Sequence, residues 1–347
     1  QITGGGTVCS GMNAGDLILT GHTGEVQHWE SSTDGGSSWQ VLANTTDSQS
    51  YNNITQTTMY RAYVKSGFCP EEYSDTATLL VDPQADAGML AADAIVCTGM
   101  NSGTLQLSGY AGNIMKWQYD NGNGWTDTAH TADNLDYNNL TATTAYRVIL
   151  ESGVCPNDTS NVVTITVIEE SLGGSILSDA NVCEGDNYDT LFLTGHLGDI
   201  LQWEFSDDGG FTWVPIINTD SIQVYNNLTV TTQYRAQVQS FTCPPAYSSV
   251  ATITVDQEPD AGILVENASV CSGSNSDTLV LTGYFGNIVK WEINDGNGWQ
   301  DIANTTDEQP YSNISVTTSY RAIVANGACP DDTSNIVTIS VIDSTQG

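Results

Sequence analysis

The sequence predicts an all-β protein, a tandem array of four β-sandwich domains, and three observations favour this fold class. First, the stretch at residues 51–61 returns three times with its spacing intact, so the chain repeats one unit. Second, apolar and polar residues alternate after each stretch, which is typical of a strand with one face on a core. Third, no segment shows a helical period. The three returns are residues 137–147, 225–235 and 311–321.

The repeat divides the 347 residues into four units of about 87 residues each. The segments between units are short and lack the length of a flexible tether, so we expect a semi-rigid string of domains. The segment begins and stops at the same phase of the repeat, as expected of a piece of a longer array. The predicted domains are residues 1–84, 85–170, 171–258 and 259–347.

The repeated stretch itself predicts the kind of sandwich. Each copy holds a Tyr preceded six residues earlier by Leu or Ile. In Ig-like sandwiches a Tyr near the start of strand F buries its ring, and its hydroxyl bonds back to the E–F crossing. We therefore predict Ig-like (fibronectin III-like) domains of about seven strands. The predicted corner tyrosines are Tyr60, Tyr146, Tyr234 and Tyr320.

The strands of the first unit follow in order from the alternation of apolar and polar residues. An A strand precedes Cys9, and strand C carries an inward Trp29. Strands B, C, the following short strand, F and G are predicted at residues 16–21, 26–31, 39–42, 59–66 and 74–81, and residues 51–53 lead over the corner into strand F.

One Trp follows the first Cys of every unit by twenty residues, and a second Trp follows a Gly-rich turn. A large apolar ring at a fixed phase is typical of a core position. The predicted core residues are Trp29, Trp117, Trp203 and Trp291.

The eight cysteines fall as one pair in each unit. They form no Cys-x-x-Cys motif and no Cys–His cluster, so zinc and redox catalysis are not indicated. We predict one structural disulfide per domain, each closing a loop of about 60 residues and stabilising its domain by roughly 4 kcal/mol. Such bonds imply an extracellular setting. The predicted disulfide cysteines are Cys9 with Cys69, Cys97 with Cys155, Cys183 with Cys243, and Cys271 with Cys329.

The composition excludes some partners. Seven Lys and Arg stand against 41 Asp and Glu, for a formal charge of −34, although only 14% of the residues are charged. A field this negative opposes binding to nucleic acid and to anionic membrane surfaces. No run of eighteen apolar residues is present, so direct membrane insertion is not predicted.

The sequence frame resembles the tandem Ig-like repeats of very large type IX-secreted surface proteins of gliding and marine Bacteroidetes. The motifs that carry the resemblance are VCSG at residues 8–11, LILTGH at 17–22, DGGSSW at 34–39, NITQTTMYRA at 53–62 and GFCP at 67–70. The resemblance implies a non-enzymatic structural or adhesive stalk in a cell-surface adhesin or filamentous appendage. The implied partners are other copies of the chain, neighbouring repeats of a longer chain, and a surface or glycan target bound through domains outside this segment.

A hydrolase remains an alternative, because two segments match the Asp-box pattern of sialidase propellers. An Asp box is itself a folding element in which the Asp caps a hairpin turn, and a sialidase site would need clustered arginines, which this chain lacks. We therefore predict no catalytic residues, and at most a non-catalytic part of a secreted hydrolase. The two segments are residues 32–39 and 206–213.

Glycan binding by the repeats is a second alternative. His22 and His196 share a position with Tyr110 and Tyr284, so an aromatic body is required there and not a base or a metal ligand. Exposed aromatic rings can stack on sugars, but a single ring at a strand end is also a plain packing feature.

Acidic residues between units raise the possibility of calcium, with no other cofactor predicted. A hard cation needs six to eight oxygen ligands, and domain boundaries are where these carboxylates gather. The alternative is solvated linker charge. The candidate ligands are Asp82, Asp86, Asp256, Glu258 and Asp260.

One Arg follows each corner Tyr, and a period of two turns it to the outer face of strand F. The residue after each core Trp lies on the same face of strand C, so the two should pair across the strands, each pair contributing at most about 1 kcal/mol. The predicted pairs are Glu30–Arg61, Glu204–Arg235 and Glu292–Arg321, with Gln118–Arg147 as the neutral counterpart.

Finally, the hairpin after strand C differs in length between alternate units, so the full period is a two-unit block of 174 residues. Duplication of a pair explains this without function. Alternatively, neighbouring chains in a filament dock laterally at every second domain.

Overall fold

The structure is a computed structural model that describes residues 1–177, 179–265 and 267–342. The chain divides into two units, Gln1–Glu169 and Glu170–Gly347, and each holds two repeats. The described residues contain strands and no helix, so none of them forms a helix long and apolar enough to cross a membrane.

Within the described residues every repeat contains nine strands in the same order, which we relate to Ig strands A, A′, B, C, C′, E, F, a short extra strand, and G. The first repeat contains β1 (Ile2–Thr3), β2 (Gly6–Cys9), β3 (Ala14–Leu19), β4 (Glu25–Ser32), β5 (Gln40–Leu42), β6 (Ser48–Asn52), β7 (Thr58–Lys65), β8 (Glu72–Tyr73) and β9 (Ala77–Asp82). The second contains β10 (Met89–Leu90), β11 (Ala94–Cys97), β12 (Ser102–Ser108), β13 (Asn113–Asp120), β14 (Thr126–Asp127), β15 (Asn134–Asn138), β16 (Thr144–Glu151), β17 (Asp158–Thr159) and β18 (Val163–Ile168).

The second unit repeats this order. The third repeat contains β19 (Ser175–Ile176), β20 (Ala180–Cys183), β21 (Tyr188–Thr194), β22 (Asp199–Ser206), β23 (Val214–Ile216), β24 (Ile222–Asn226), β25 (Thr232–Gln239), β26 (Ala246–Tyr247) and β27 (Ala251–Asp256). The fourth contains β28 (Ile263–Leu264), β29 (Ala268–Cys271), β30 (Ser276–Thr282), β31 (Asn287–Asn294), β32 (Gln300–Ile302), β33 (Glu308–Ser312), β34 (Thr318–Ala325), β35 (Asp332–Thr333) and β36 (Val337–Ile342).

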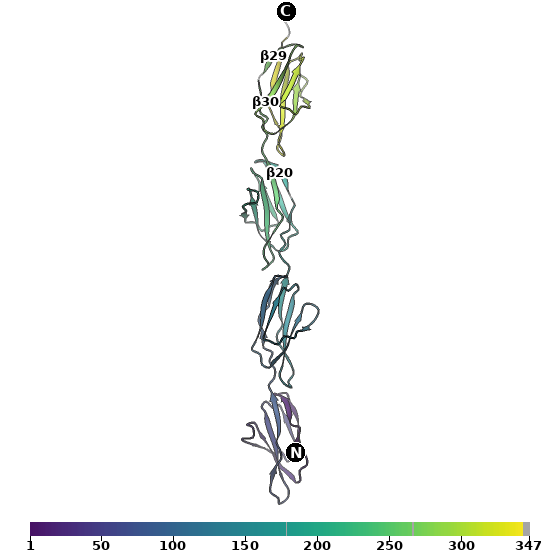
Figure 1. The fold of residues 1–347 in the computed structure, drawn as a ribbon, viewed down its shortest axis with the longest axis vertical. Helices are drawn as coiled ribbons and strands as arrows, with labels where there is room; N and C mark the ends of the chain where they lie inside the picture. The colour runs from purple at the N-terminus through teal and green to yellow at the C-terminus, as the bar shows by residue number, and fades with distance from the viewer. Residues whose placement is uncertain (178, 266, 343–347) are drawn as a thin grey trace, which may run out of the picture. The chain divides into compact units, whose positions relative to one another are not determined.

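Each repeat is a sandwich of two sheets (Figure 1). In the first repeat β1, β3 and β6 form a three-stranded sheet, and β2, β9, β7, β4 and β5 follow one another in the second sheet, with β8 paired to β7. The A′ strand β2 runs parallel to the G strand β9, and the other pairs are antiparallel. An A strand split between the two sheets is the arrangement of Ig-like domains. The all-β, Ig-like fold class is confirmed.

The core lies between the two sheets, where the inward residues of both alternate with outward polar ones. The four tryptophans of strand C are fully buried. Each indole N–H donates to a backbone carbonyl before strand E, so its one polar atom is satisfied. The acceptors are the carbonyls of Thr46, Ala132, Asp220 and Thr306, at 2.8–2.9 Å.

The four tyrosines at the start of strand F are also buried, and burial raises the pKa of each phenol, to about 12 for Tyr234. Before each of them, an Asn in the left-handed region of backbone space turns the chain between strands E and F, a conformation that Asn adopts more readily than most residues. A hydroxyl bond from these tyrosines to the crossing stays a prediction. The turn residues are Asn53, Asn139, Asn227 and Asn313.

Candidate functional site

The candidate site of each unit lies at the boundary between its two domains. At the end of the first domain, the A′ strand and the G strand stop side by side, since Cys9 is in register with Asp82. The Ser10 N–H donates to the Asp82 carbonyl at 2.9 Å, and the Gln84 side chain donates to the Ser10 carbonyl at 2.8 Å. The segment that leaves the first domain is therefore held against the end of the A′ strand.

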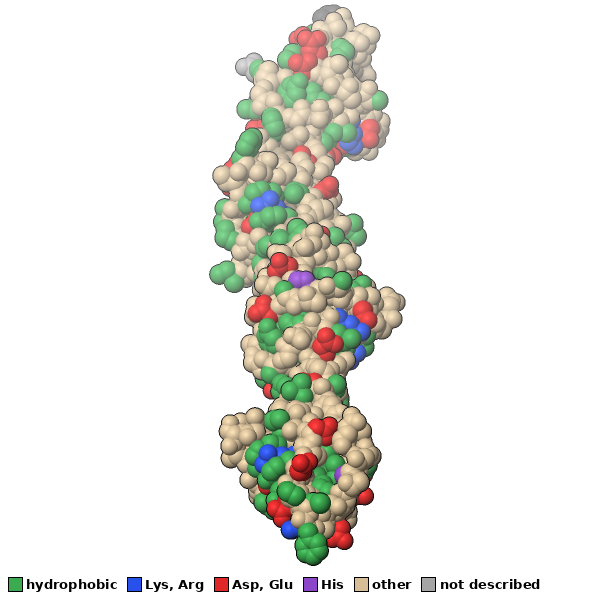
Figure 2. All heavy atoms as spheres, turned by 60° about the horizontal axis from the view of Figure 1, so that its bottom comes forward, with side chains coloured by type: hydrophobic (Ala, Val, Ile, Leu, Met, Phe, Trp, Pro, Cys, Tyr) green, Lys and Arg blue, Asp and Glu red, His purple; other side chains and the backbone are tan. Residues whose placement is uncertain are grey.

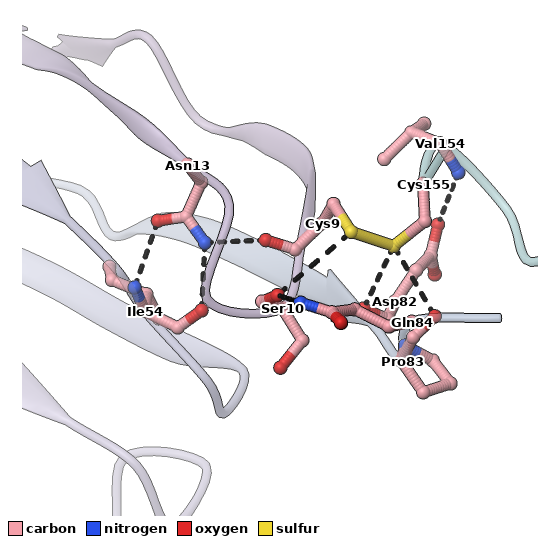
Figure 3. Close-up of a disulfide and its surroundings, with 9 residues drawn as sticks. All are labelled: Cys9, Ser10, Asn13, Ile54, Asp82, Pro83, Gln84, Val154 and Cys155. Atoms are coloured by element: carbon pink, nitrogen blue, oxygen red, sulfur yellow. Dashed lines mark hydrogen bonds between the residues drawn. A yellow bond between two sulfur atoms is a disulfide. The ribbon is translucent and has the colours of Figure 1, made fainter. Parts of the chain in front are cut away.

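A disulfide crosses this boundary. Cys9, at the end of β2, is bonded to Cys155 in the F–G turn of the second domain, with Cα atoms 4.8 Å apart (Figure 3). The Cys155 sulfur also lies 3.5 Å from the Asp82 carbonyl oxygen and 3.3 Å from that of Pro83. A disulfide sulfur has no proton to donate, so these are close contacts that show how tightly the turn packs on the linker.

The Cys9 side of the bond is fixed by the side chain of Asn13, as Figure 3 shows. Its amide donates to the carbonyls of Cys9 at 2.6 Å and Ile54 at 2.7 Å, and its oxygen accepts the Ile54 N–H at 2.9 Å. One side chain thus ties the end of the A′ strand to the E–F crossing of the same domain.

The Asp82 carboxylate of the first domain also binds the F–G turn of the second domain. Its Oδ2 accepts the N–H of Val154 at 3.0 Å, next to the disulfide. A Cβ added to the preceding Gly153 would lie 1.8 Å from that oxygen, and Gly153 has a φ of +50°. Only glycine fits here, because both the approach of the carboxylate and the backbone conformation exclude a side chain.

The linker is also tied to the second domain. The Ala87 N–H donates to Asp158 at 2.8 Å, and the Leu90 N–H donates to Asn161 at 2.7 Å. Asp86 pairs with Ala111 in an isolated bridge. Because both ends of the linker are bonded, little free chain remains between the two domains. We call the contacts around this bond the Cys9–Cys155 junction.

The same arrangement recurs inside the second unit as the Cys183–Cys329 junction. The two cysteines are bonded with Cα atoms 4.6 Å apart, and both bonds span 146 residues. Asp256 Oδ2 accepts the Ala328 N–H at 2.8 Å, and Asn187 donates to the Cys183 carbonyl at 2.8 Å. Because the same geometry occurs in both units, the junction is a property of the repeated pair of domains and not of one copy.

The prediction that cysteines pair within a domain is therefore wrong for Cys9 and Cys69. Cys9 lies beside the E–F crossing before β7, whereas Cys69 follows the far end of β7. That strand has eight residues and spans about 26 Å, far beyond the Cα separation of a disulfide. The predicted pairs Cys97–Cys155, Cys183–Cys243 and Cys271–Cys329 are also wrong, because Cys155 is bonded to Cys9, and Cys183 and Cys329 are bonded to each other.

Cys69 and Cys271 are free thiols and both are exposed, so their prediction as disulfide residues is also wrong. Cys97 and Cys243 are disulfide-bonded.

Four of the five calcium candidates accept hydrogen bonds from backbone N–H groups. Asp82 and Asp256 accept backbone N–H groups at the junctions, and Asp86 and Asp260 cap the N–H groups of Gly88 and Gly262. In the described part of the chain, no three His, Cys, Asp or Glu side chains gather as a metal site would require. Calcium at these residues, including Glu258, stays a prediction.

The Asp boxes act as turn caps. Asp208 accepts the backbone N–H of Thr212 at 2.9 Å and its hydroxyl at 2.5 Å, and the Ser206 hydroxyl at 2.7 Å. These bonds lower the pKa of Asp208 to about 2, with the Thr212 hydroxyl as the largest cause. Asp34 is held in the same way, by Ser38 foremost, and its pKa is also lowered. Both oxygens of each carboxylate accept hydrogen bonds that hold the hairpin, so the carboxylates have a structural role.

The outer face of strands C and F carries the predicted charge pairs, which are confirmed. The Nε atoms of Arg61, Arg235 and Arg321 donate to Glu30, Glu204 and Glu292 at 2.6–2.7 Å, and Arg147 donates to Gln118 at 2.7 Å. The three glutamate side chains are 8–10% exposed, so these pairs are more buried than a surface salt bridge.

The sequence did not reveal that each of these guanidinium groups lies over the second Trp of its domain. The distance from the guanidinium carbon to the ring centroid is 4.0–4.2 Å, within cation–π range. Figure 2 shows the consequence on one face: basic side chains lie in small groups beside hydrophobic ones. The stacked rings are Trp39, Trp125, Trp213 and Trp299. The sequence feature that could have indicated this contact is the Gly-rich turn that precedes each of these tryptophans.

The two tyrosines that were considered for glycan binding are partly exposed. Tyr110 and Tyr284 are 38% and 37% exposed. A single ring of this kind gives no cleft for a sugar.

Comparison with solved structures finds multi-domain Ig proteins at low identity. A structure of three titin Ig domains is 12% identical with a TM-score of 0.48, covering 75% of this chain and 99% of that chain. Sidekick-1 Ig domains 1–4 are 12% identical with a TM-score of 0.34, covering 97% and 96%. Extracellular domains 3–5 of Drosophila OTK are 11% identical with a TM-score of 0.34, covering 75% and 97%.

A search of curated proteins found no matching relative. One family matches nearly the whole sequence, in four consecutive copies at residues 1–83, 86–169, 172–257 and 260–343. The chain therefore belongs to the family described as "Domain of unknown function (DUF8696)", of which it contains four tandem members.

Proposed function

We propose that this chain is a non-enzymatic segment of an extracellular stalk, in which disulfides between neighbouring domains transmit tension. The observation that carries the proposal is the bond from Cys9 to Cys155 and its copy from Cys183 to Cys329. A chain of independent Ig-like domains needs no covalent bond across its junctions. These bonds are of use where the domains must stay together under load.

The bonds change the path of a pulling force. Tension that enters at the N-terminus reaches Cys9 and passes through the disulfide to Cys155, so the backbone between them is not in the direct covalent path. A second such bypass runs from Cys183 to Cys329. Each bond spans 146 residues and would keep on the order of 500 Å of extended chain from being released.

The same bonds stabilise the domains at rest. Closing a loop of this length lowers the entropy of the unfolded chain and, by the chain-entropy estimate, contributes about 5 kcal/mol for each bond. The hydrogen bonds of Asp82 and Asp256 hold the F–G turns in place beside the bonds. Stability and resistance to stretching thus come from one device.

Disulfides of this kind favour an oxidising, extracellular location. The resemblance to type IX-secreted surface proteins of Bacteroidetes agrees with such a location and with a role in a surface adhesin or filament. We propose that the repeats form the stalk and that any adhesive target is bound elsewhere.

Single-molecule stretching between terminal handles tests the proposal. The protein used is the Cys69→Ser/Cys271→Ser variant, which keeps both junction disulfides and cannot couple to other molecules through free thiols. In the oxidised protein we expect short extensions only. After full reduction, unfolding should release on the order of 500 Å more for each of the two bonds.

A variant that also carries Cys155→Ser and Cys329→Ser is the matched control, and it should extend further than its parent before any reductant is added. Equal extension of the oxidised and reduced parent would show that the bonds do not bypass the domains, and would refute a tension-bearing role.

A further inference from the structure

A cavity of about 360 Å³ opens at one edge of the second domain, between strand C (β13) and strand E (β15). Strand E is the edge strand of the three-stranded sheet, because the C′ strand β14 pairs with β13 in the other sheet. Within the described residues, no ladder of hydrogen bonds therefore closes the sandwich on this side. We call this space the C–E cavity. Three tyrosines line it, namely Tyr119, Tyr137 and Tyr146.

The three rings come from both sheets. Tyr119 and Tyr146 are opposite each other on strands C and F, and a period of two puts Tyr119 on the same inward face as the buried Trp117. Tyr137 belongs to strand E and is in register with Gly103 on strand B. A Cβ added to Gly103 would lie 2.6 Å from the Cζ of Tyr137, so a side chain there would have to displace the ring. Gly103 thus allows the ring to lie against strand B, and the space between the sheets stays open.

Several polar groups of the cavity have no protein partner. In the described part of the chain, the hydroxyls of Tyr119 and Tyr137 make no hydrogen bond, and both are open to solvent. The side-chain amide nitrogens of Asn121 and Asn138, also in the lining, have no acceptor among the described residues. Each of these groups is therefore able to bond to a ligand without first losing a bond to protein.

The lining is nearly uncharged. Among the lining residues Asp136 is the one acidic residue, and none is basic. The Asp136 carboxylate accepts the hydroxyl of Thr104 at 2.5 Å, and the alternation along strand E turns it to the face opposite that of Tyr137. A charged ligand would leave water here without a counter-charge, which costs free energy. The lining therefore favours a neutral ligand.

The third domain has a cavity of about 370 Å³ at the same place. Phe205, Tyr225 and Tyr234 occupy the positions of the three tyrosines in its lining. Because the cavity occurs in both units, it is a property of the repeat and not of one domain. Phe205 keeps the ring but lacks the hydroxyl, and the first and fourth domains have Ser31 and Ile293 at this position.

Aromatic rings beside unpartnered hydroxyls and amides indicate a class of ligand. A pyranose has an apolar face of C–H groups that packs on a tyrosine ring, and hydroxyls around its edge that bond to phenols and amides. Ligand pockets measure about 300–1,000 Å³ and combine apolar walls with a few placed polar groups. We propose that the C–E cavity of the second domain binds one ring of a neutral sugar, held by Tyr119, Tyr137 and Tyr146. This goes beyond the stalk proposal, because it gives a repeat a ligand of its own.

The test is an NMR titration of the full chain, isotope-labelled and carrying Cys69→Ser and Cys271→Ser to prevent coupling through free thiols. The probes are the methyl pyranosides of glucose, galactose, mannose and N-acetylglucosamine, added one at a time to millimolar concentration. We expect at least one of them to shift the backbone amides of residues 119–121 and 135–146 in a saturable way, while the rest of the second domain stays unchanged.

Three substitutions separate the ring from its hydroxyl. Tyr119→Phe keeps the ring and removes one hydrogen-bonding group, so the sugar should bind about two- to tenfold more weakly. Tyr119→Ser gives the second domain the residue of the first and should abolish the saturable shifts. In the third domain, Phe205→Tyr adds the hydroxyl and should strengthen binding by a similar factor. A spectrum that is unchanged without sugar shows that a variant is folded, and the two Phe–Tyr exchanges decide the matter if Tyr119→Ser fails this control.

The proposal is wrong if none of the four glycosides gives saturable shifts, if the shifts lie outside the cavity, or if Tyr119→Phe and Phe205→Tyr bind as the parent does. Shifts at the cavity with p-cresol but with none of the glycosides would assign it to an aromatic side chain of a partner protein, and would also overturn the sugar. No outcome bears on the stalk proposal, which rests on the bonds between domains and is tested by stretching.

Discussion

The odd domains (first and third) and the even domains (second and fourth) share one core but differ on the outer face of the sheet. In the odd domains the Arg of strand F contacts a second ring besides the Trp, since the guanidinium carbons of Arg61 and Arg235 lie 3.7 and 3.9 Å from the ring centroids of Tyr73 and Tyr247. In the even domains Thr159 takes the place of this Tyr in the second domain and Thr333 in the fourth.

The even domains instead have a Lys–Asp ion pair between strands C and C′. Lys116 on strand C reaches Asp127 on strand C′ at 2.6 Å, and Lys290 reaches Asp301 at 2.7 Å. The odd domains have Val41 and Pro215 at the position of these aspartates. The junction Asp is also confined to odd domains, since Asp82 and Asp256 correspond to Ile168 and Ile342.

This difference shows which parts of the repeat are free to vary. Inward residues must fill the space between two sheets, so apolar residues recur at these positions in all four copies. Outward residues need only satisfy solvent and their neighbours, so the faces have diverged into an aromatic kind and a charged kind. The structural period of the chain is therefore the pair of domains.

The largest effect should be common to both kinds of domain. Trp203→Ala in the third domain and Trp117→Ala in the second each remove a fully buried ring and leave a cavity. Each should destabilise its own domain by about 3–5 kcal/mol. Hydrogen exchange of the full chain, measured domain by domain, checks this; a much smaller loss in one of the two would contradict a common core.

The next largest effect should differ between the odd and the even domains. Arg235→Met leaves the buried Glu204 carboxylate without its cation, which should destabilise the third domain by about 3 kcal/mol. Arg147→Met leaves only the neutral Gln118, so the loss in the second domain should be about 1 kcal/mol. Both changes remove one Arg–Trp contact, and Arg235→Met also removes the contact with Tyr247, so only a difference larger than the roughly 0.5–1 kcal/mol expected for that ring is assigned to the charge of Glu204. Equal losses under the same exchange measurement would show that the charge of Glu204 is unimportant.

Exchanging the outer ring should have a smaller effect. Tyr247→Thr gives the third domain the residue of the even domains and removes one of the two ring contacts of Arg235. We expect a loss of about 0.5–1 kcal/mol. The reverse change, Thr159→Tyr, should stabilise the second domain by a similar amount, as local exchange rates would report. If neither change alters the stability of its domain, the contact between the Tyr247 ring and Arg235 contributes no cation–π energy.

The smallest expected effect is on the Asp-box hairpin and depends on pH. Bonds from Thr212 and Ser206 hold the pKa of Asp208 at about 2 in the folded domain, below the ordinary value of 3.8. A lowered folded pKa stabilises the hairpin above pH 3.8, and this contribution is lost as pH falls toward 2. Exchange of the 206–213 hairpin should accelerate in that window.

Two comparisons make the pH test specific. The Asp208→Asn variant should lose the acceleration. The fourth domain should also show none, because the carbonyl oxygen of Asn294, which does not titrate, caps its turn. Acceleration in the fourth domain over the same window would point to general acid unfolding.

Much of the fold could be predicted from the sequence because local patterns carry it. The spacing of Trp29 and Tyr60 placed strands C and F, and a period of two turned Glu30 and Arg61 to one face. The sequence could not show that Trp39 covers Arg61, since the residues come from a turn and a strand whose approach depends on how the hairpin folds back. The extra short strand β8 was likewise missed, because two residues give no period.

The sequence by itself determined that eight cysteines occur at two fixed phases of the repeat, but this spacing suits pairing inside a domain and pairing with the next domain equally well. Only the tertiary structure decided between them. Strand F carries Cys69 to the end of the sandwich opposite Cys9, while the linker brings Cys155 of the following domain against it. The physical reason is the length of one strand: a disulfide bridges only a few ångströms between Cα atoms, and an eight-residue strand is several times longer.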